Sequence, residues 1–295
     1  MTRPTHALSV DVEDWYNGLV LVCDDRVVPP TPAVVRNTEA LLALFAERGV
    51  RATWFLLGEV AATFPSLVAR IAAGGHELGV HGFHHYRVER YTPDTFREAM
   101  RRAKETVEQA GGRAVLGHRA VAFSVTPQTP WVYEVLAGLG FRYDSSVFPF
   151  AGRRYGIADA PLVPYRIPTA QGAIDEVPLA VVRLGPVRLP CAGGGYLRHF
   201  PLWWTRMGLR RCEAEGRSAV MYLHPYEVEL GYDEAFVRRE LLRVAPRRLA
   251  RIRRSQYRNR DRTVTKLRRL MAEFSFAPVA SLLGLPVSTA ASIVA

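Results

Sequence analysis

Short apolar runs alternate with longer amphipathic segments along most of this chain. The short runs predict buried strands and the amphipathic segments predict helices, two of which open with a Thr-Pro pair that is typical of a helix cap. The predicted strands cover 7–10, 52–56, 77–80, 115–118, 141–143 and 219–223, and the predicted helices cover 32–48, 65–73, 93–109, 130–137 and 201–215. This alternation predicts the α/β fold class with parallel βαβ units.

The pattern changes in the middle and at the end of the chain. Residues 149–200 are rich in Pro and Gly and contain short β-like runs, which predict irregular strands and loops inserted over the mouth of a barrel. Residues after 232 combine periodic apolar positions with many arginines, which predict basic helices. We therefore expect a barrel domain over 1–232, including the insertion, and a helical basic C-terminal extension over 233–295.

Composition and charge narrow the class of protein. With 48% hydrophobic and 23% charged residues, the chain has the composition of a soluble globular protein. Its three cysteines lie far apart without a C-x-x-C motif, so neither a zinc knuckle nor a disulfide framework is indicated. No signal-peptide pattern or membrane-spanning run occurs, which predicts a cytoplasmic location.

The net charge of +11 admits nucleic acid, anionic lipid or an acidic polymer as a partner. Much of the excess arginine lies after residue 237, and such runs are usually solvated faces. We expect no nucleic-acid partner, and we leave open a peripheral contact of the basic helices with a membrane or an anionic polymer. The sequence does not indicate an oligomeric state.

Reactive side chains follow the predicted strands at their carboxyl ends, which is where sites gather in parallel α/β folds. His81 and His85 stand four residues apart and can face one point, and neutral imidazoles bind borderline metals well. A bare H-x-x-x-H is more often a polar surface loop, but an acidic cluster follows the first strand. Asp11, Glu13, Asp14, Arg119, Asp144 and His224 complete the set of polar residues at strand ends.

These residue types match the needs of metal-assisted amide hydrolysis. That reaction requires ligands that leave an open position, a base for water, a stabiliser for the oxyanion and an acid for the leaving nitrogen. Asp11 and Glu13 are two apart on a strand and share a face, so one can act as a base while the other binds metal. His224 comes from the opposite end of the sequence and could protonate the leaving amine.

The motifs, in their order, resemble those of the polysaccharide deacetylases of carbohydrate esterase family 4, the NodB-homology group. Gly82 stands in the usual Ser/Thr place and Val121 in the usual proline place. More closely, the chain resembles exosortase-associated deacetylases with an extra C-terminal region. The motifs are D-V-E-D-W at 11–15, H-G-F-H-H at 81–85, R-A-V-A-F-S at 119–124, Y-D-S-S at 143–146 and L-H-P at 223–225.

The resemblance implies a distorted (β/α) barrel of the NodB-homology type that carries a divalent metal, commonly zinc. It also implies roles: Asp11 as the base oriented by Arg119, His224 as the acid oriented by Asp144, and His81 and His85 as metal ligands.

Five further residues receive roles with an alternative. Glu13 occupies the place of the third ligand, where the family usually has Asp, and the adjacent Asp14 is the other candidate. Trp15 and Tyr16 are candidates for stacking on a sugar ring, with core packing equally expected, and Ser145 is a candidate substrate contact.

The leading hypothesis is a metal-dependent N-deacetylase that hydrolyses acetamido groups of N-acetylhexosamine residues in a polysaccharide, in exopolysaccharide or cell-envelope biosynthesis. One alternative is a metal-independent cyclic imide or ureide amidohydrolase on the same fold. Another is a non-catalytic carbohydrate-binding module. The joint presence of Asp11, Arg119, Asp144 and His224 argues against the module, which needs neither an acid nor a base.

Overall fold

A nine-stranded, mostly parallel sheet organises the structure, a computed structural model that describes residues 4–17, 27–229, 231 and 246–287. Its strand order is β10-β1-β2-β3-β4-β5-β7-β6, with β11 beside β1, and only the β6–β7 pair is antiparallel. The strands are β1 (His6–Val12), β2 (Thr53–Leu56), β3 (Glu77–Val80), β4 (Gly117–His118), β5 (Tyr143–Asp144), β6 (Tyr165–Thr169), β7 (Gly172–Glu176), β10 (Val220–Leu223) and β11 (Phe276–Ala277). A separate hairpin pairs β8 (Val181–Leu184) with β9 (Val187–Pro190).

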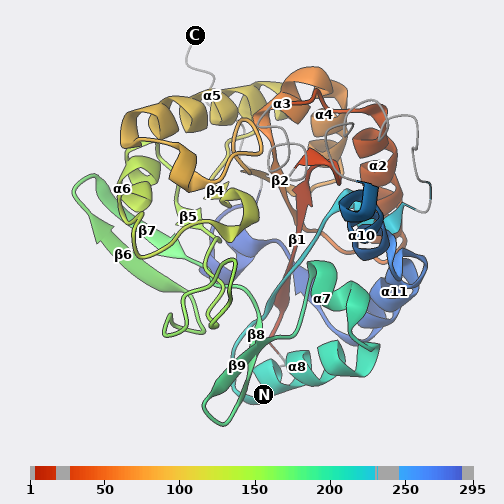
Figure 1. The fold of residues 1–295 in the computed structure, drawn as a ribbon. Coiled ribbons are helices and arrows are strands. Elements are labelled where there is room, and N and C mark those ends of the chain that lie inside the picture. Colours follow the sequence, from red (N-terminus) through yellow and green to blue (C-terminus); the bar gives the residue numbers. More distant parts are fainter. Residues whose placement is uncertain (1–3, 18–26, 230, 232–245, 288–295) are drawn as a thin grey trace.

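Helices surround the curled sheet (Figure 1). Their apolar faces pack on strands that are almost fully buried and form the larger of two hydrophobic cores among the described residues. The smaller core includes Phe55, Phe123 and Tyr222. Thr31 and Thr92 cap helices α2 and α5 as their sequences predict. The helices are α2 (Pro32–Glu47), α3 (Gly58–Thr63), α4 (Pro65–Ala73), α5 (Pro93–Gly111), α6 (Trp131–Gly138), α7 (Gly194–His199), α8 (Leu202–Ala214), α10 (Pro246–Tyr257) and α11 (Thr263–Glu273). No helix among the described residues is both long and apolar enough to cross a bilayer.

The predicted α/β class and the curled parallel sheet of the NodB type are confirmed. The inserted region differs in part from the expectation. Strand β7 continues the main sheet, because Tyr143 and Asp144 of β5 pair in parallel with Asp175 and Glu176. Of the strands in this region, only β8 and β9 lie outside that sheet.

The C-terminal region contributes directly to the barrel. Strand β11 pairs with β1, and the backbone N–H groups of Val279 and Ala280 donate to Thr53 Oγ1 at 2.7 Å and Glu77 Oε2 at 3.1 Å. Both residues are fully buried. The predicted domain boundary at 232/233 lies within 232–245, which is outside the described residues, so it remains a prediction. The described residues beyond it, however, join the main sheet and both hydrophobic cores of the rest of the chain.

Candidate functional site

Parallel register brings the acidic cluster and the histidine pair to one level of the sheet. Val12 of β1 pairs with Leu56 of β2, which pairs in turn with Val80 of β3. Glu13 and His81 each follow directly, so both leave the sheet at the same end, on strands separated only by β2. This is the carboxyl edge where sites form in parallel α/β folds.

The turn after β3 places the second histidine. Gly82 adopts φ of +101°, a backbone conformation that L side chains rarely take. A Cβ at this position would lie 3.1 Å from the carbonyl oxygen of His84. This turn therefore favours the glycine that stands in the usual Ser/Thr place of the motif, and it brings the rings of His81 and His85 to a centroid distance of 6.0 Å.

Glu13, His81 and His85 form a compact group of buried ligand atoms. One carboxylate oxygen and one nitrogen of each ring all lie within 4.8 Å of one another. Glu13 Oε2 contacts His85 Nε2 and lies 3.8 Å from His81 Nε2. The described residues contain no other group of three or more such ligands that meets this distance.

The chemistry of this group fits a divalent ion. His81 Nδ1 lies 2.8 Å from the carbonyl oxygen of Arg119, so Nδ1 is the donor and Nε2 keeps a free electron pair toward Glu13. Burial lowers the pKa of His81 to about 4, which keeps it neutral. Burial opposes ionisation of Glu13, but His85, His224 and His81 together lower its pKa to about 2. Neutral imidazole and ionised carboxylate are the forms that bind zinc.

Beside this group, Asp11 is held by a fully buried arginine. Arg119 Nη1 donates to Asp11 Oδ1 at 2.8 Å and to Ser9 Oγ at 2.7 Å. Arg119 Nε and Nη2 donate to the backbone oxygen and the hydroxyl of Ser145, both at 2.9 Å. The guanidinium thus links β1 to the residue after β5 and fixes the Asp11 carboxylate next to His81.

Ser145 binds Arg119, whereas the sequence predicted that Ser145 contacts the substrate. Its side chain is fully buried. Its hydroxyl accepts from Arg119 and donates to the carbonyl oxygen of Val177 at 2.8 Å. Because the hydroxyl is fully buried between these two neighbours, it is not exposed to a substrate.

His224 follows β10 and approaches the same group from the other side. Its Nε2 lies 3.6 Å from Glu13 Oε1, and its Nδ1 lies 3.7 Å from Glu227 Oε2. Tyr226 stacks on the imidazole, with ring centroids 4.8 Å apart and planes 12° from parallel. Burial alone would lower the pKa of His224, but Glu227, Glu13 and Asp11 raise it to about 9. The imidazole is therefore protonated at neutral pH and can supply a proton.

Asp144 is placed differently from the prediction, which paired it with His224. Its Oδ1 lies 2.7 Å from His118 Nδ1 and accepts from Ser146 Oγ at 2.8 Å. On its other side lies the carboxyl of Glu176, whose pKa burial and Asp144 raise well above the ordinary value. The carboxylate beside His224 is Glu227, which sequence reasoning missed although it lies only three residues further along the chain.

Asp14 points away from the metal-ligand group, although the sequence left it as an alternative ligand. Its Oδ2 accepts from the hydroxyl of Tyr16 at 2.8 Å and from the backbone N–H of Thr31 at 2.9 Å, at the start of α2. Trp15 and Tyr16 are only 7% and 2% exposed, so their rings pack in the core rather than face a sugar. Of the two candidate carboxylates, the geometry favours Glu13.

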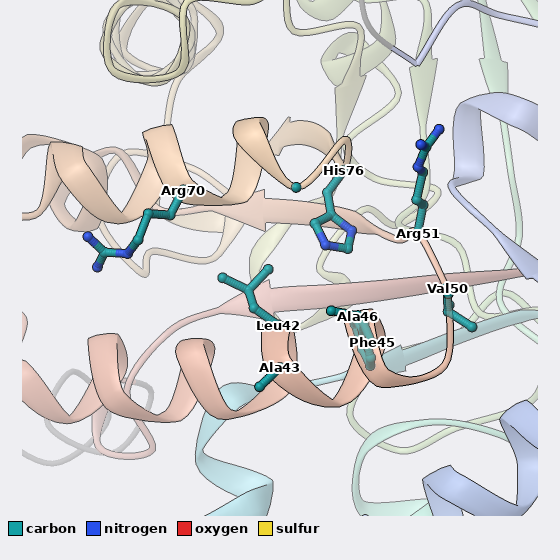
Figure 2. Close-up of a pocket in the computed structure, with 10 residues that line it drawn as sticks. Leu42, Ala43, Phe45, Ala46, Val50, Arg51, Arg70 and His76 are labelled. Carbon is teal, nitrogen blue, oxygen red and sulfur yellow. The ribbon is translucent and has the colours of Figure 1, made fainter.

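A separate hollow of about 450 Å³ lies at the opposite end of the strands (Figure 2). Helix α2, the turn into β2 and the C-terminal end of α4 form its walls, and its polar residues are Arg51, Arg70 and His76. His76 Nδ1 accepts the backbone N–H of Ala52 at 3.1 Å and so has a structural task. The hollow contains none of the motif residues and is not the candidate site.

Two family models match this chain. Residues 18–142 match a model described as polysaccharide deacetylase, and residues 145–284 match one described as a domain of unknown function (DUF3473). A peptidoglycan-N-acetylglucosamine deacetylase of Bacillus cereus is 35% identical over 77 residues, 26% of this chain and 28% of that protein. A peptidoglycan deacetylase of Helicobacter pylori is 31% identical over 107 residues, 36% of each chain. The matches thus span about a third of these relatives.

The fold has a solved counterpart. The structure of a Mycobacterium smegmatis protein assigned as a polysaccharide deacetylase gives a TM-score of 0.61 at 19% identity, over 97% of this chain and 92% of the other. At this identity the likeness concerns the fold alone. The closer prediction of an exosortase-associated subfamily remains a prediction. The matched model, the relatives and the motifs nevertheless agree: residues 18–142 of this chain belong to the polysaccharide deacetylase family.

Proposed function

We propose that this protein is a metal-dependent N-deacetylase that releases acetate from N-acetylhexosamine residues of a polysaccharide. The observation that carries this proposal is the arrangement of three functional parts around one point. Asp11 with its arginine and His224 both lie close to the ligand group of Glu13, His81 and His85.

The chain's own residues account for the proton transfers. When bound, a divalent ion polarises a carbonyl and makes water more acidic, and Glu13, His81 and His85 would hold it. The Asp11 carboxylate, fixed by Arg119, takes the proton from the attacking water. His224 gives its proton from Nε2, which faces Glu13, to the leaving nitrogen. The water oxygen forms a bond to the acetyl carbon, the C–N bond breaks, and acetate and a free amine result.

The substrate class follows from the relatives and from the chemistry of the site. Both bacterial relatives are named for deacetylation of peptidoglycan, one of them at N-acetylglucosamine. An acetamido group supplies the carbonyl and the leaving nitrogen that this arrangement of base and acid addresses. We therefore propose N-acetylhexosamine polymers, in exopolysaccharide or cell-envelope biosynthesis, as the substrates, and Zn²⁺ as the ion.

Acetate release from a series of N-acetylglucosamine oligomers tests the proposal, with zinc-loaded and chelator-treated protein in parallel. Release by the loaded protein alone would support a metal-dependent deacetylase. Hydrolysis of cyclic imides or ureides by metal-free protein would favour the amidohydrolase alternative. Oligomer binding without any acetate release, with zinc bound, would favour a carbohydrate-binding module.

A further inference from the structure

The proposed acid lies in the region that matches the domain of unknown function, together with a buried ion pair. Glu227 and Arg198 are 1% and 5% exposed. Glu227 Oε2 accepts the backbone N–H of His224 at 3.2 Å, besides its approach to Nδ1, and Glu227 Oε1 lies 3.4 Å from Arg198 Nε. The carboxylate therefore lies between the imidazole and a guanidinium, and its pKa is lowered by both despite burial.

The guanidinium is anchored in turn on the C-terminal region. Arg198 Nη1 donates to the backbone carbonyls of Ser255 and Gln256, in the last turn of α10, the first at 3.0 Å. Carbonyls in a last helical turn have no partner within the helix, and the negative end of the helix dipole favours a cation there. Asn259 Nδ2 donates back to the carbonyl of Arg198 at 3.3 Å. This segment therefore fixes Arg198 from both sides.

The face of the imidazole is supported by the same region. Tyr226 stacks on His224, and the guanidinium of Arg260 lies over the rings of Tyr226 and Tyr257, at 5.2 Å and 3.8 Å from their centroids. Arg260 is itself buried. The imidazole is thus bounded at Nδ1 by Glu227 and on its face by Tyr226, which leaves Nε2 as the nitrogen directed toward Glu13.

We infer that the region matched by the domain of unknown function, residues 145–284, completes the active site, and that within it Glu227 is the positioning residue of His224, held in place by Arg198. This inference rests on the proposed function and extends it to a region that the deacetylase model does not cover. A carboxylate 3.7 Å from Nδ1 favours a proton on that nitrogen by its charge, so that Nε2 is the nitrogen that faces the substrate. Arg198 and α10 make this arrangement depend on the C-terminal chain.

The experiment compares an amide with an activated ester in full-length, zinc-loaded protein. An amide nitrogen takes a proton from His224 when the C–N bond breaks, whereas 4-nitrophenolate leaves 4-nitrophenyl acetate without one. We expect Glu227→Gln to lower kcat on an N-acetylglucosamine tetramer by about 10–100-fold, less than the about 10²–10⁴-fold that a whole general acid contributes. KM, zinc content and turnover of the ester should stay close to the wild-type values, because the variant removes an interaction that acts only when the amine leaves.

Matched variants make the outcomes decisive. Arg198→Lys should show the same amide-selective loss to a smaller degree, and it replaces Glu227→Gln if that variant does not fold. Glu59→Gln removes another buried carboxylate that contacts a histidine, His84, at 2.6 Å, and it should leave the amide-to-ester ratio unchanged.

These measurements distinguish failure of the positioning role of Glu227 from failure of the proposed function. Equal loss of amide and ester turnover in Glu227→Gln, or unchanged amide turnover, would overturn the positioning role of Glu227. A normal amide-to-ester ratio in His224→Ala would show that the leaving-group acid lies elsewhere, which overturns the acid assignment in the proposed function and this inference with it. Wild-type protein without amide hydrolysis would refute the deacetylase itself.

Discussion

The two halves of the candidate site are built in different ways. The metal half, Glu13 with His81 and His85, comes from neighbouring parts of one sheet edge, where parallel register and the turn at Gly82 set the distances. The acid half, His224 with Glu227, depends on a short turn after β10 and on a C-terminal segment far away in sequence. Motifs on adjacent strands are therefore readable from the sequence, whereas the partner of His224 is determined by tertiary packing.

The largest loss of activity should come from removing a residue of the metal-ligand group. We expect His81→Ala to lose its bound zinc, as measured by metal analysis, and to lose acetate release to the level of chelator-treated protein. His84→Ala is the control, since His84 is partly exposed and pairs with Glu59 outside the ligand group. Full acetate release by metal-free wild-type protein would contradict this assignment and favour the metal-independent alternative.

Removing the proposed base should reduce activity less than removing a metal ligand does, because the metal ligands stay in place. We expect Asp11→Asn to lower kcat by about 10²–10⁴-fold, the contribution of one general base, while zinc stays bound. Asp175→Asn, on β7 in an exposed ion pair with Arg166, is the control and should keep wild-type turnover. A loss of zinc in Asp11→Asn would show instead that Asp11 is a ligand.

The same contrast explains how much of the structure could be predicted. The strands and most helices follow from apolar runs and Thr-Pro caps, but α3 was not predicted, because it is only six residues long and begins without a side-chain cap. The H-x-x-x-H pair and the acidic cluster were found because each lies within a few residues of one strand end. The H-x-x-x-H pair and the acidic cluster could therefore be predicted from their local spacing in the sequence.

The predicted pairing of Asp144 with His224 differs from the structure, because strand order separates the two residues. Asp144 is on β5 and pairs in register with His118 of the adjacent β4, which explains their hydrogen bond. His224 follows β10, and β1 to β4 lie between β10 and β5 in the sheet. A motif names the residue types at the strand ends, but adjacency decides which of them meet.

Substitutions of the two candidate ligands in the acidic cluster, Glu13 and Asp14, should have different effects on zinc binding. Glu13→Gln should lose zinc, because it removes a ligand charge, whereas Asp14→Asn should keep zinc and lose stability. We expect a loss of about 1.5–3 kcal/mol in Asp14→Asn, the range for a hydrogen bond to a charged group, since Asp14 joins Tyr16 and the start of α2. Zinc titration and urea unfolding of both variants check this. Loss of zinc in Asp14→Asn alone would reverse the assignment.

The smallest expected effect is on the pH dependence of the free energy of unfolding, and it comes from two histidines outside the site, His6 and His76. Burial lowers the pKa of His6 and of His76 to about 4, and each Nδ1 accepts a backbone N–H that a proton on that atom would displace. The unfolded chain, with an ordinary histidine pKa near 6.5, takes up these protons first as the pH falls. Each imidazole therefore lowers the free energy of unfolding progressively between about pH 6.5 and pH 4.

The variant His76→Asn isolates one of these imidazoles, since the asparagine oxygen can still accept the N–H of Ala52. Urea unfolding of both proteins at pH 7.5 and pH 5.5 should show the wild type losing about 1 kcal/mol more than the variant over this range. Asp14, whose pKa burial raises to about 6, acts in the opposite direction, but it is present in both proteins and cancels in the difference. His6→Asn repeats the test at the start of β1, where the N–H of Ala219 is the donor. Parallel stability curves for variant and wild type would show that the imidazole titrates alike in the folded and unfolded chains, so that its burial carries no pH-dependent cost.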